Sequence, residues 1–125
     1  MKKILLLLFI FFSCKLLANQ PQDWTKVSCP NKNHEDIYEY LMFFVKYTNA
    51  DIGYNDGHQF NAYFTIPTET CYEAMHILNV IIYDGSFLYN LEQSIQFEAD
   101  FESCAEEVRQ QVVDIEKILQ HIDKI

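Results

Sequence analysis

Two stretches of this chain alternate apolar and polar side chains, and this pattern constrains the fold more than any other feature. Successive side chains of a strand point to opposite faces, so a period of two predicts a strand with one buried face. The first stretch covers residues 60–66 and the second covers residues 91–101, where only Gln93 interrupts the apolar parity. We therefore expect two strands, each with an inner and an outer side.

Three other segments have the spacing of helices. Asn33 can cap a helix whose first turn contains Glu35 and Asp36, where carboxylates meet the positive end of the helix dipole. Apolar residues recur every three or four positions in the segments 37–48, 71–82 and 105–122. Thr70 and Glu73 have the spacing of a capping box, which predicts that the second helix begins near residue 71.

A strand signal followed by a helix signal occurs twice, and the two segments have similar sequences. The segment FTIPTETCYEAM (64–75) aligns without gaps on FEADFESCAEEV (97–108), at an offset of 33 residues that superposes Cys71 on Cys104. Chance similarity is the alternative, but both segments read as a strand that leads into a helix. We expect an α+β fold in the order α-β-α-β-α, with helices packed on a small sheet and a tandem β-α repeat. An all-α bundle is the alternative fold.

The first residues have the form of an export signal. Two lysines precede an apolar run of nine residues, which is too short to span a bilayer and is typical of a secretory signal peptide. Cleavage after Ala18 is the first expectation, and lipid attachment at Cys14 is the alternative. The predicted organisation is a signal peptide (1–18), an extended leader (19–33) and one globular domain (34–125).

The charge balance limits the choice of partners. The whole chain has a formal net charge of −9, and removal of Lys2, Lys3 and Lys15 with the signal lowers it to −12. Such a charge repels phosphates and anionic lipids, so we expect neither nucleic acid nor anionic lipid as a ligand. We also expect no membrane span, because the first apolar run is too short for one. A solvated acidic surface explains the charge, and so does attraction to a basic protein.

Three cysteines remain after signal removal, and cysteines of exported proteins usually pair. A bridge between Cys71 and Cys104 is the first choice, and a bridge between Cys29 and Cys71 is the second. One thiol is left over in either case. A homodimer linked through that thiol, or paired through the C-terminal helix, is an open alternative.

Motifs for catalysis and metal binding are weak. The chain has no Gly-rich phosphate loop and no nucleophile motif, so we predict no catalytic residues, no cofactor and no enzyme. Glu73 and His76 have the Glu-x-x-His spacing of di-iron bundles, but the repeat has Arg109 where a second histidine would be needed. We therefore predict no metal site.

These observations leave three functional hypotheses. The first is an exported, periplasmic or secreted protein of the envelope that binds or inhibits a basic protein, in the manner of an immunity protein. The second is a redox protein or enzyme that uses a thiol at a helix start, where the dipole lowers a thiol pKa. The third is a structural lipoprotein that is anchored to the envelope through Cys14.

Overall fold

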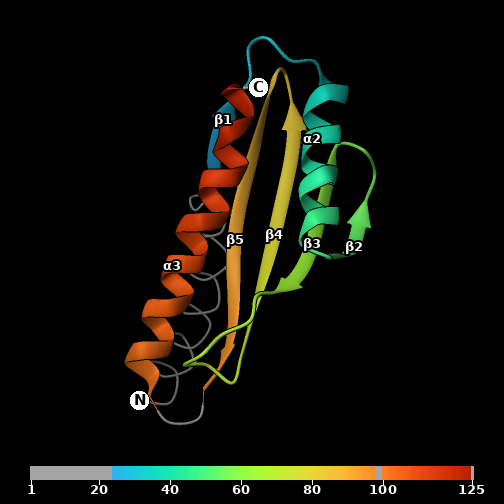
Figure 1. The fold of residues 1–125 in the computed structure, drawn as a ribbon. Coiled ribbons are helices and arrows are strands. Elements are labelled where there is room, and N and C mark those ends of the chain that lie inside the picture. The colour runs from blue at the N-terminus through green and yellow to red at the C-terminus, as the bar shows by residue number, and fades with distance from the viewer. Residues whose placement is uncertain (1–23, 98–99, 125) are drawn as a thin grey trace, which may run out of the picture.

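The computed structural model describes residues 24–97 and 100–124, with no account of the Asp123 side chain. The elements in chain order are β1 (Thr25–Ser28), α2 (His34–Tyr47), β2 (Asp51–Asn55), β3 (Gln59–Thr65), β4 (Glu73–Tyr83), β5 (Ser86–Gln96), α3 (Phe101–Gln120) and the short 3-10 helix η2 (His121–Lys124). Two helices lie on one face of a single sheet (Figure 1).

The sheet is antiparallel throughout and has the strand order β1-β5-β4-β3-β2. Strands β2 to β5 form a meander in which each strand pairs with the next along the chain. Only β1 pairs across a long sequence separation, with Thr25 opposite Tyr89 and Ser28 opposite Ser86. The longest pairing joins β4 and β5, which have eleven residues each, and both strands lie inside the sheet with a neighbour on either side.

The β4–β5 hairpin closes at Asp84 and Gly85, whose φ angles of 47° and 67° lie in the left-handed region. Tyr83 and Ser86 are paired on either side of this two-residue turn. Two positive φ angles match a type I′ turn, whose twist suits an antiparallel pair and which favours Asp-Gly. Asp84-Gly85, just beyond the segment 71–82 that was predicted as a helix, is the hairpin turn.

The core lies between the sheet and the two helices. Both helices contribute buried residues to the same apolar cluster as the inner faces of β3, β4 and β5. The fully buried large side chains include Ile37, Leu41 and Phe44 of α2, Leu119 of α3, Phe60 of β3, Leu78 of β4 and Phe87 of β5. A second, smaller cluster contains Cys71, Ala74, Cys104 and Val108.

The first and the third of the three predicted helices are confirmed, as α2 and α3. Helix α2 begins after Asn33, whose side chain accepts a hydrogen bond from the amide of Asp36, and the Asp36 carboxylate accepts one from the amide of Asn33 in return. Helix α3 begins after Asp100 and buries Val108, Ile115 and Leu119, which belong to the predicted apolar stripe. The predicted strand 60–66 is also confirmed, as β3.

The predicted helix over 71–82 is wrong, because Glu73–Tyr83 is the strand β4. Every second residue from Ala74 to Ile82 is buried, including His76. The other parity carries Met75, Ile77 and Ile81, which are partly buried, so both faces are largely apolar. An apolar strand of this kind also satisfies helical spacing, and the polar His76 hides its alternation.

The α-β-α-β-α order and the tandem β-α repeat are therefore wrong, and so is the all-α alternative. The two aligned segments differ in structure: Cys71 lies in the loop before a strand, and Cys104 lies in the first turn of α3. The second predicted strand begins and ends earlier than expected, at Ser86–Gln96. The protein is α+β, with a five-stranded antiparallel sheet.

The predicted signal peptide and Cys14 lie outside the described residues. Within the predicted leader, residues 25–28 are extended, but they form β1 and belong to the sheet. Strand β2 lies in a segment for which the sequence predicted no strand. Its Gly53 faces the side chains of Asn61 and Tyr63 so closely that a Cβ atom would lie 2.6 Å from Asn61 Oδ1.

Candidate functional site: the acidic end

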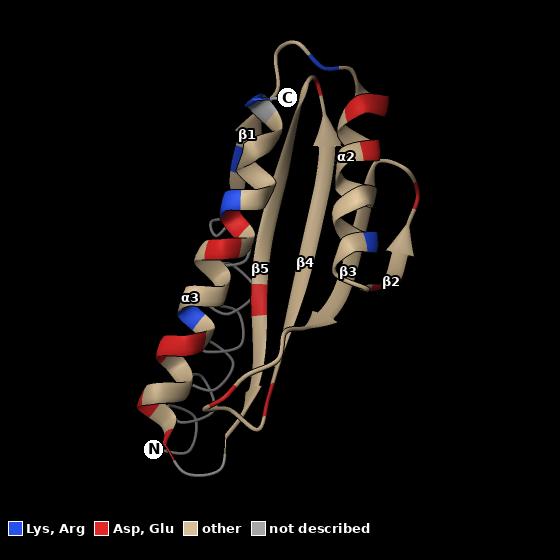
Figure 2. Cartoon of the chain, viewed as in Figure 1, with Lys and Arg blue, Asp and Glu red and all other residues tan. Residues whose placement is uncertain are grey.

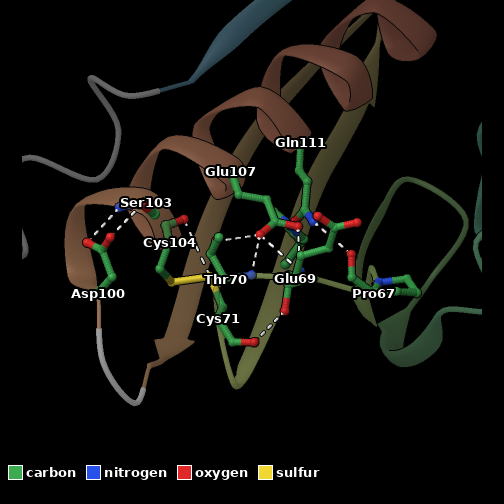
Figure 3. Close-up of a disulfide and its surroundings, with 11 residues drawn as sticks. Pro67, Glu69, Thr70, Cys71, Asp100, Ser103, Cys104, Glu107 and Gln111 are labelled. Carbon is green, nitrogen blue, oxygen red and sulfur yellow. Dashed lines mark hydrogen bonds between the residues drawn. A yellow bond between two sulfur atoms is a disulfide. The ribbon is translucent and has the colours of Figure 1, made fainter.

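A disulfide joins the loop before β4 to the first turn of α3. Cys71 and Cys104 have an S–S distance of 2.08 Å and a Cα–Cα distance of 4.8 Å. This is the pairing that the sequence analysis placed first. The bridge attaches the start of α3 to the β3–β4 loop, residues 66–72 (Figure 3).

Glu107, one turn after Cys104, fastens the same loop a second time. Its carboxylate accepts hydrogen bonds from the amides of Glu69 (2.9 Å) and Thr70 (2.9 Å) and from the Thr70 hydroxyl (2.5 Å) (Figure 3). The loop also receives a hydrogen bond from Gln111, whose Nε2 donates to the carbonyl of Pro67 at 3.3 Å. A covalent bond and a set of side-chain bonds thus hold the loop on α3.

The hydrogen bonds change the titration of two carboxyl groups here. The Thr70 hydroxyl and the amides of Thr70 and Glu69 hold the pKa of Glu107 below its ordinary value. Asp100 caps α3 by accepting from the Ser103 hydroxyl and amide, and these bonds lower its pKa as well. Both groups stay ionised in mildly acidic solution, so their contacts persist there.

Carboxylates are concentrated around the disulfide-bonded loop 66–72, as the red segments at the start of α3 and on the neighbouring loop show (Figure 2). We call this region the acidic end. Its described carboxylates are Glu69, Glu73, Asp100, Glu102, Glu106 and Glu107. Arg109, which forms an ion pair with Glu106, is the only Lys or Arg among the described residues 66–73 and 100–110.

Lysines lie away from the acidic end. They occur on β1, before α2, at the end of α2 and in the last turns of α3 and η2, where Figure 2 shows blue segments. The described chain therefore has an uneven charge distribution. A cationic partner would be attracted to the start of α3 in preference to the opposite end of the helix.

Other residues singled out from the sequence lie apart. Cys29 is buried with 1% of its surface exposed, and its Sγ donates to the Val27 carbonyl at 3.7 Å. Glu73 is exposed and His76 is buried, because three residues along a strand lead to opposite faces. This strand geometry separates the two side chains of the Glu-x-x-His pair.

The C-terminal helix buries its apolar stripe on its own sheet. Val108, Ile115 and Leu119 are at most 4% exposed. A homodimer through this helix would have to use its outer side, which carries mainly charged and amide residues. Among the described residues, no group of three or more His, Cys, Asp or Glu side chains is arranged to hold a metal ion.

Sequence reasoning found the disulfide but missed the clamp made by Glu107. The residue is one of several acids in a helical segment, and nothing in its spacing separates it from Glu106. Its role depends on the β3–β4 loop reaching α3, which only the three-dimensional fold shows. None of the helices in the described ranges is long and apolar enough to cross a membrane.

The comparisons with known proteins add no relative. The sequence matches no protein-family model, and no curated protein is a significant match to it.

Proposed function

We propose that this protein is an exported, non-enzymatic binding protein whose acidic end engages a basic protein. The observation that carries the proposal is the concentration of carboxylates on a loop and a helix start that are joined by a disulfide. Charge of one sign accelerates the approach of an oppositely charged partner and selects against acidic ones.

The rigid support of this surface also favours binding. A loop that is already ordered loses little conformational freedom when a partner arrives, so less of the interaction energy is spent on ordering. The disulfide and the Glu107 clamp both order residues 66–72 in this way. A disulfide also suits the oxidising environment of an exported protein, which supports a periplasmic or secreted location.

The test is a comparison of two triple variants of residues 19–125 that remove the same charge. One variant neutralises the acidic end with Glu69→Gln, Glu73→Gln and Glu102→Gln. The other neutralises exposed carboxylates elsewhere with Glu39→Gln, Asp51→Asn and Asp114→Asn. Each immobilised protein is exposed to an envelope extract at several salt concentrations, and retained proteins are identified by mass spectrometry.

We expect the native protein to retain a basic protein at low salt and to lose it as salt screens the charges. Binding should fall at least tenfold in the acidic-end variant and remain within about twofold in the control variant. Equal losses in both variants would show that net charge alone attracts the partner. Retention of no basic protein at any salt concentration would refute the proposal.

A thiol-dependent redox function is the second candidate. It requires a sulfur that an attacking thiolate can reach, whereas Cys71 is 8% exposed and Cys104 is fully buried. The sequence predicted a helix start at Cys71, but the residue precedes the strand β4. It therefore lacks the helix dipole that would lower the pKa of its thiol. For these reasons we place the redox function below the binding function.

A lipid-anchored envelope protein is the third candidate, and it depends on Cys14, outside the described residues. The intact mass of the protein purified from its own envelope distinguishes the two forms. A mass equal to residues 19–125 supports the secreted form, and a mass that begins at Cys14 with added acyl chains supports the anchored form.

A further inference from the structure

A histidine lies fully buried between the two apolar clusters of the core. His76 projects from the inner face of β4 and has no exposed surface. Its ring stacks on Phe64 of β3 with 5.6 Å between the ring centroids, and Phe64 in turn meets Phe44 of α2. The imidazole thus lies beside apolar side chains of the sheet and α2, in the layer under α3.

One imidazole nitrogen connects the sheet to α3. His76 Nε2 lies 2.7 Å from Gln111 Oε1, and Gln111 Nε2 donates to the Pro67 carbonyl. The bond to Pro67 fixes the Gln111 amide so that its oxygen faces the histidine. Because an amide oxygen only accepts, Nε2 must donate, and the neutral ring then carries its lone pair on Nδ1.

The second nitrogen faces no acceptor for a proton. His76 Nδ1 and Gln93 Nε2 are both buried, and neither has a hydrogen-bond partner among the described residues. Gln93 of β5 lies directly opposite His76 in the strand register. Its amide nitrogen is a donor, so it is compatible with a lone pair on Nδ1 and opposes an N–H at that position.

Within residues 24–97 and 100–124, no ionisable side chain forms a hydrogen bond or an ion pair with this ring. The ring stacks on Phe64 of β3 and bonds to Gln111 of α3, and Gln93 of β5 is its cross-strand neighbour; all three residues are neutral. On the side of α2, Phe44 contacts Phe64, and it is also uncharged. On α3, Glu107 lies one turn before Gln111, but its carboxylate is bonded to Glu69 and Thr70.

We infer that His76 makes the docking of α3 on the sheet sensitive to acid. A proton on Nδ1 places an uncompensated charge between β4, β5 and α3, and the favourable response is for α3 to separate from the sheet and let water reach the ring. The separation is local, because the disulfide and the Glu107 clamp keep the start of α3 attached to the loop.

The direction of the pH effect follows from the burial of the ring. Desolvation lowers the pKa of His76 below its ordinary value, and the bond to Gln111 opposes this only in part. The closed form therefore excludes a proton that the open form binds. Closure is favoured at pH values above about 6.5 and weakens as the pH falls below that value.

The test is an NMR titration of the disulfide-bonded protein, residues 19–125, between pH 8 and pH 4.5. The imidazole signals give the protonation of each histidine, and amide exchange, corrected for its intrinsic pH dependence, gives the opening of α3. We expect His76 to titrate below pH 6.5. The opening equilibrium of residues 112–120 should rise about tenfold per pH unit below 6.5 until the ring titrates, while residues 104–107 stay protected.

Two variants with the same charge change separate this mechanism from general acid effects. Gln93→Glu places a carboxylate opposite Nδ1 and should raise the histidine pKa and abolish the acid-induced opening. Gln96→Glu lies on the same strand with an exposed side chain and should leave both unchanged. Identical behaviour of the two folded variants would overturn the inference.

If Gln93→Glu does not fold, the titration of the native protein decides alone. Titration of His76 at or above pH 6.5, or acid protonation without faster exchange in 112–120, would overturn the inference. This acid response does not depend on the proposed basic partner, and it is measured without one.

Discussion

The two ends of α3 are held to the rest of the molecule by different means. At the acidic end, a disulfide and a carboxylate attach the helix to a polar loop, and the apolar cluster there is small. At the opposite end, which we call the core end, Ile115, Leu119 and Ile122 pack with α2 and the sheet in the main cluster. The core end has no disulfide among the described residues.

The difference shows two routes to order in one helix. Burial of apolar area stabilises the core end, at roughly 25 cal/mol per Å². The acidic end has too little apolar contact for this, and a covalent bond reduces the freedom of its unfolded chain instead. A carboxylate-rich surface can therefore be rigid without being drawn into the core.

The largest effect is expected from removing the disulfide. The bond spans 33 residues, and in the chain-entropy model a loop of this length stabilises the folded state by about 4 kcal/mol. We expect the double variant Cys71→Ala/Cys104→Ala to lose an amount of this order in chemical denaturation. Amide exchange should accelerate first in residues 66–72 and 101–108. A loss below about 1 kcal/mol would show that the acidic end does not need its disulfide.

A cavity at the core end should have the next largest effect. Leu119 is fully buried, and Leu119→Ala should lower the free energy of unfolding by about 3 kcal/mol, from lost transfer energy and the cavity. The neighbouring Ile118 is 40% exposed, so Ile118→Ala serves as the control, with a clearly smaller expected loss. Comparable losses in both variants would contradict the assignment of Leu119 to the core.

A weaker effect is expected at the start of α2, which lies at the same end of the molecule as the end of α3 (Figure 1). Asn33→Ala removes the N-cap bond to the Asp36 amide and should cost about 1 kcal/mol in chemical denaturation. Asn33→Ser retains a capping oxygen and should recover most of the loss. If alanine and serine are equally destabilising, the capping box does not contribute as described.

The smallest change in stability is expected from Glu107→Gln, because the group is exposed to solvent. The amides of Glu69 and Thr70 should exchange faster, while Glu106→Gln, which alters only an exposed ion pair, should leave them unchanged. The pKa of Glu107 is lowered in the folded state, so its contribution is present above about pH 4.5 and is lost as the pH falls. Unchanged exchange of both amides in Glu107→Gln would refute the clamp.

The sequence predicted the parts of the fold whose signals are local. The Asn33 cap, the helix 101–120 and the strand around Phe64 have patterns that fit one structure only. Strand β4 could not be separated from a helix, because both of its faces are apolar and its inner face includes His76. The Asp84-Gly85 hairpin signal was present, but it follows a segment with helical spacing, and a glycine at that place also suits the end of a helix.

Of the candidate site, only the disulfide was predictable from the sequence, because cysteines of exported proteins usually pair. The pairing of Cys71 with Cys104 came from an expected repeat that the structure does not contain, although both cysteines do lie at one end of the molecule. Glu107 and Gln111 act through contacts with residues 35 to 44 positions away. Such contacts depend on topology, and no short pattern encodes them.

The meander topology also bears on the order in which the protein folds. Strands β2 to β5 can pair by closing short loops, whereas β1 must wait for β5, about 60 residues later in the chain, before its partner exists. Distant pairings form slowly because more chain entropy is lost first. We therefore expect Val27 to acquire protection after Leu78 and Val80 in pulsed hydrogen exchange, and simultaneous protection would exclude this order. The strand that comes first in the described chain would then be the last to take its place in the sheet.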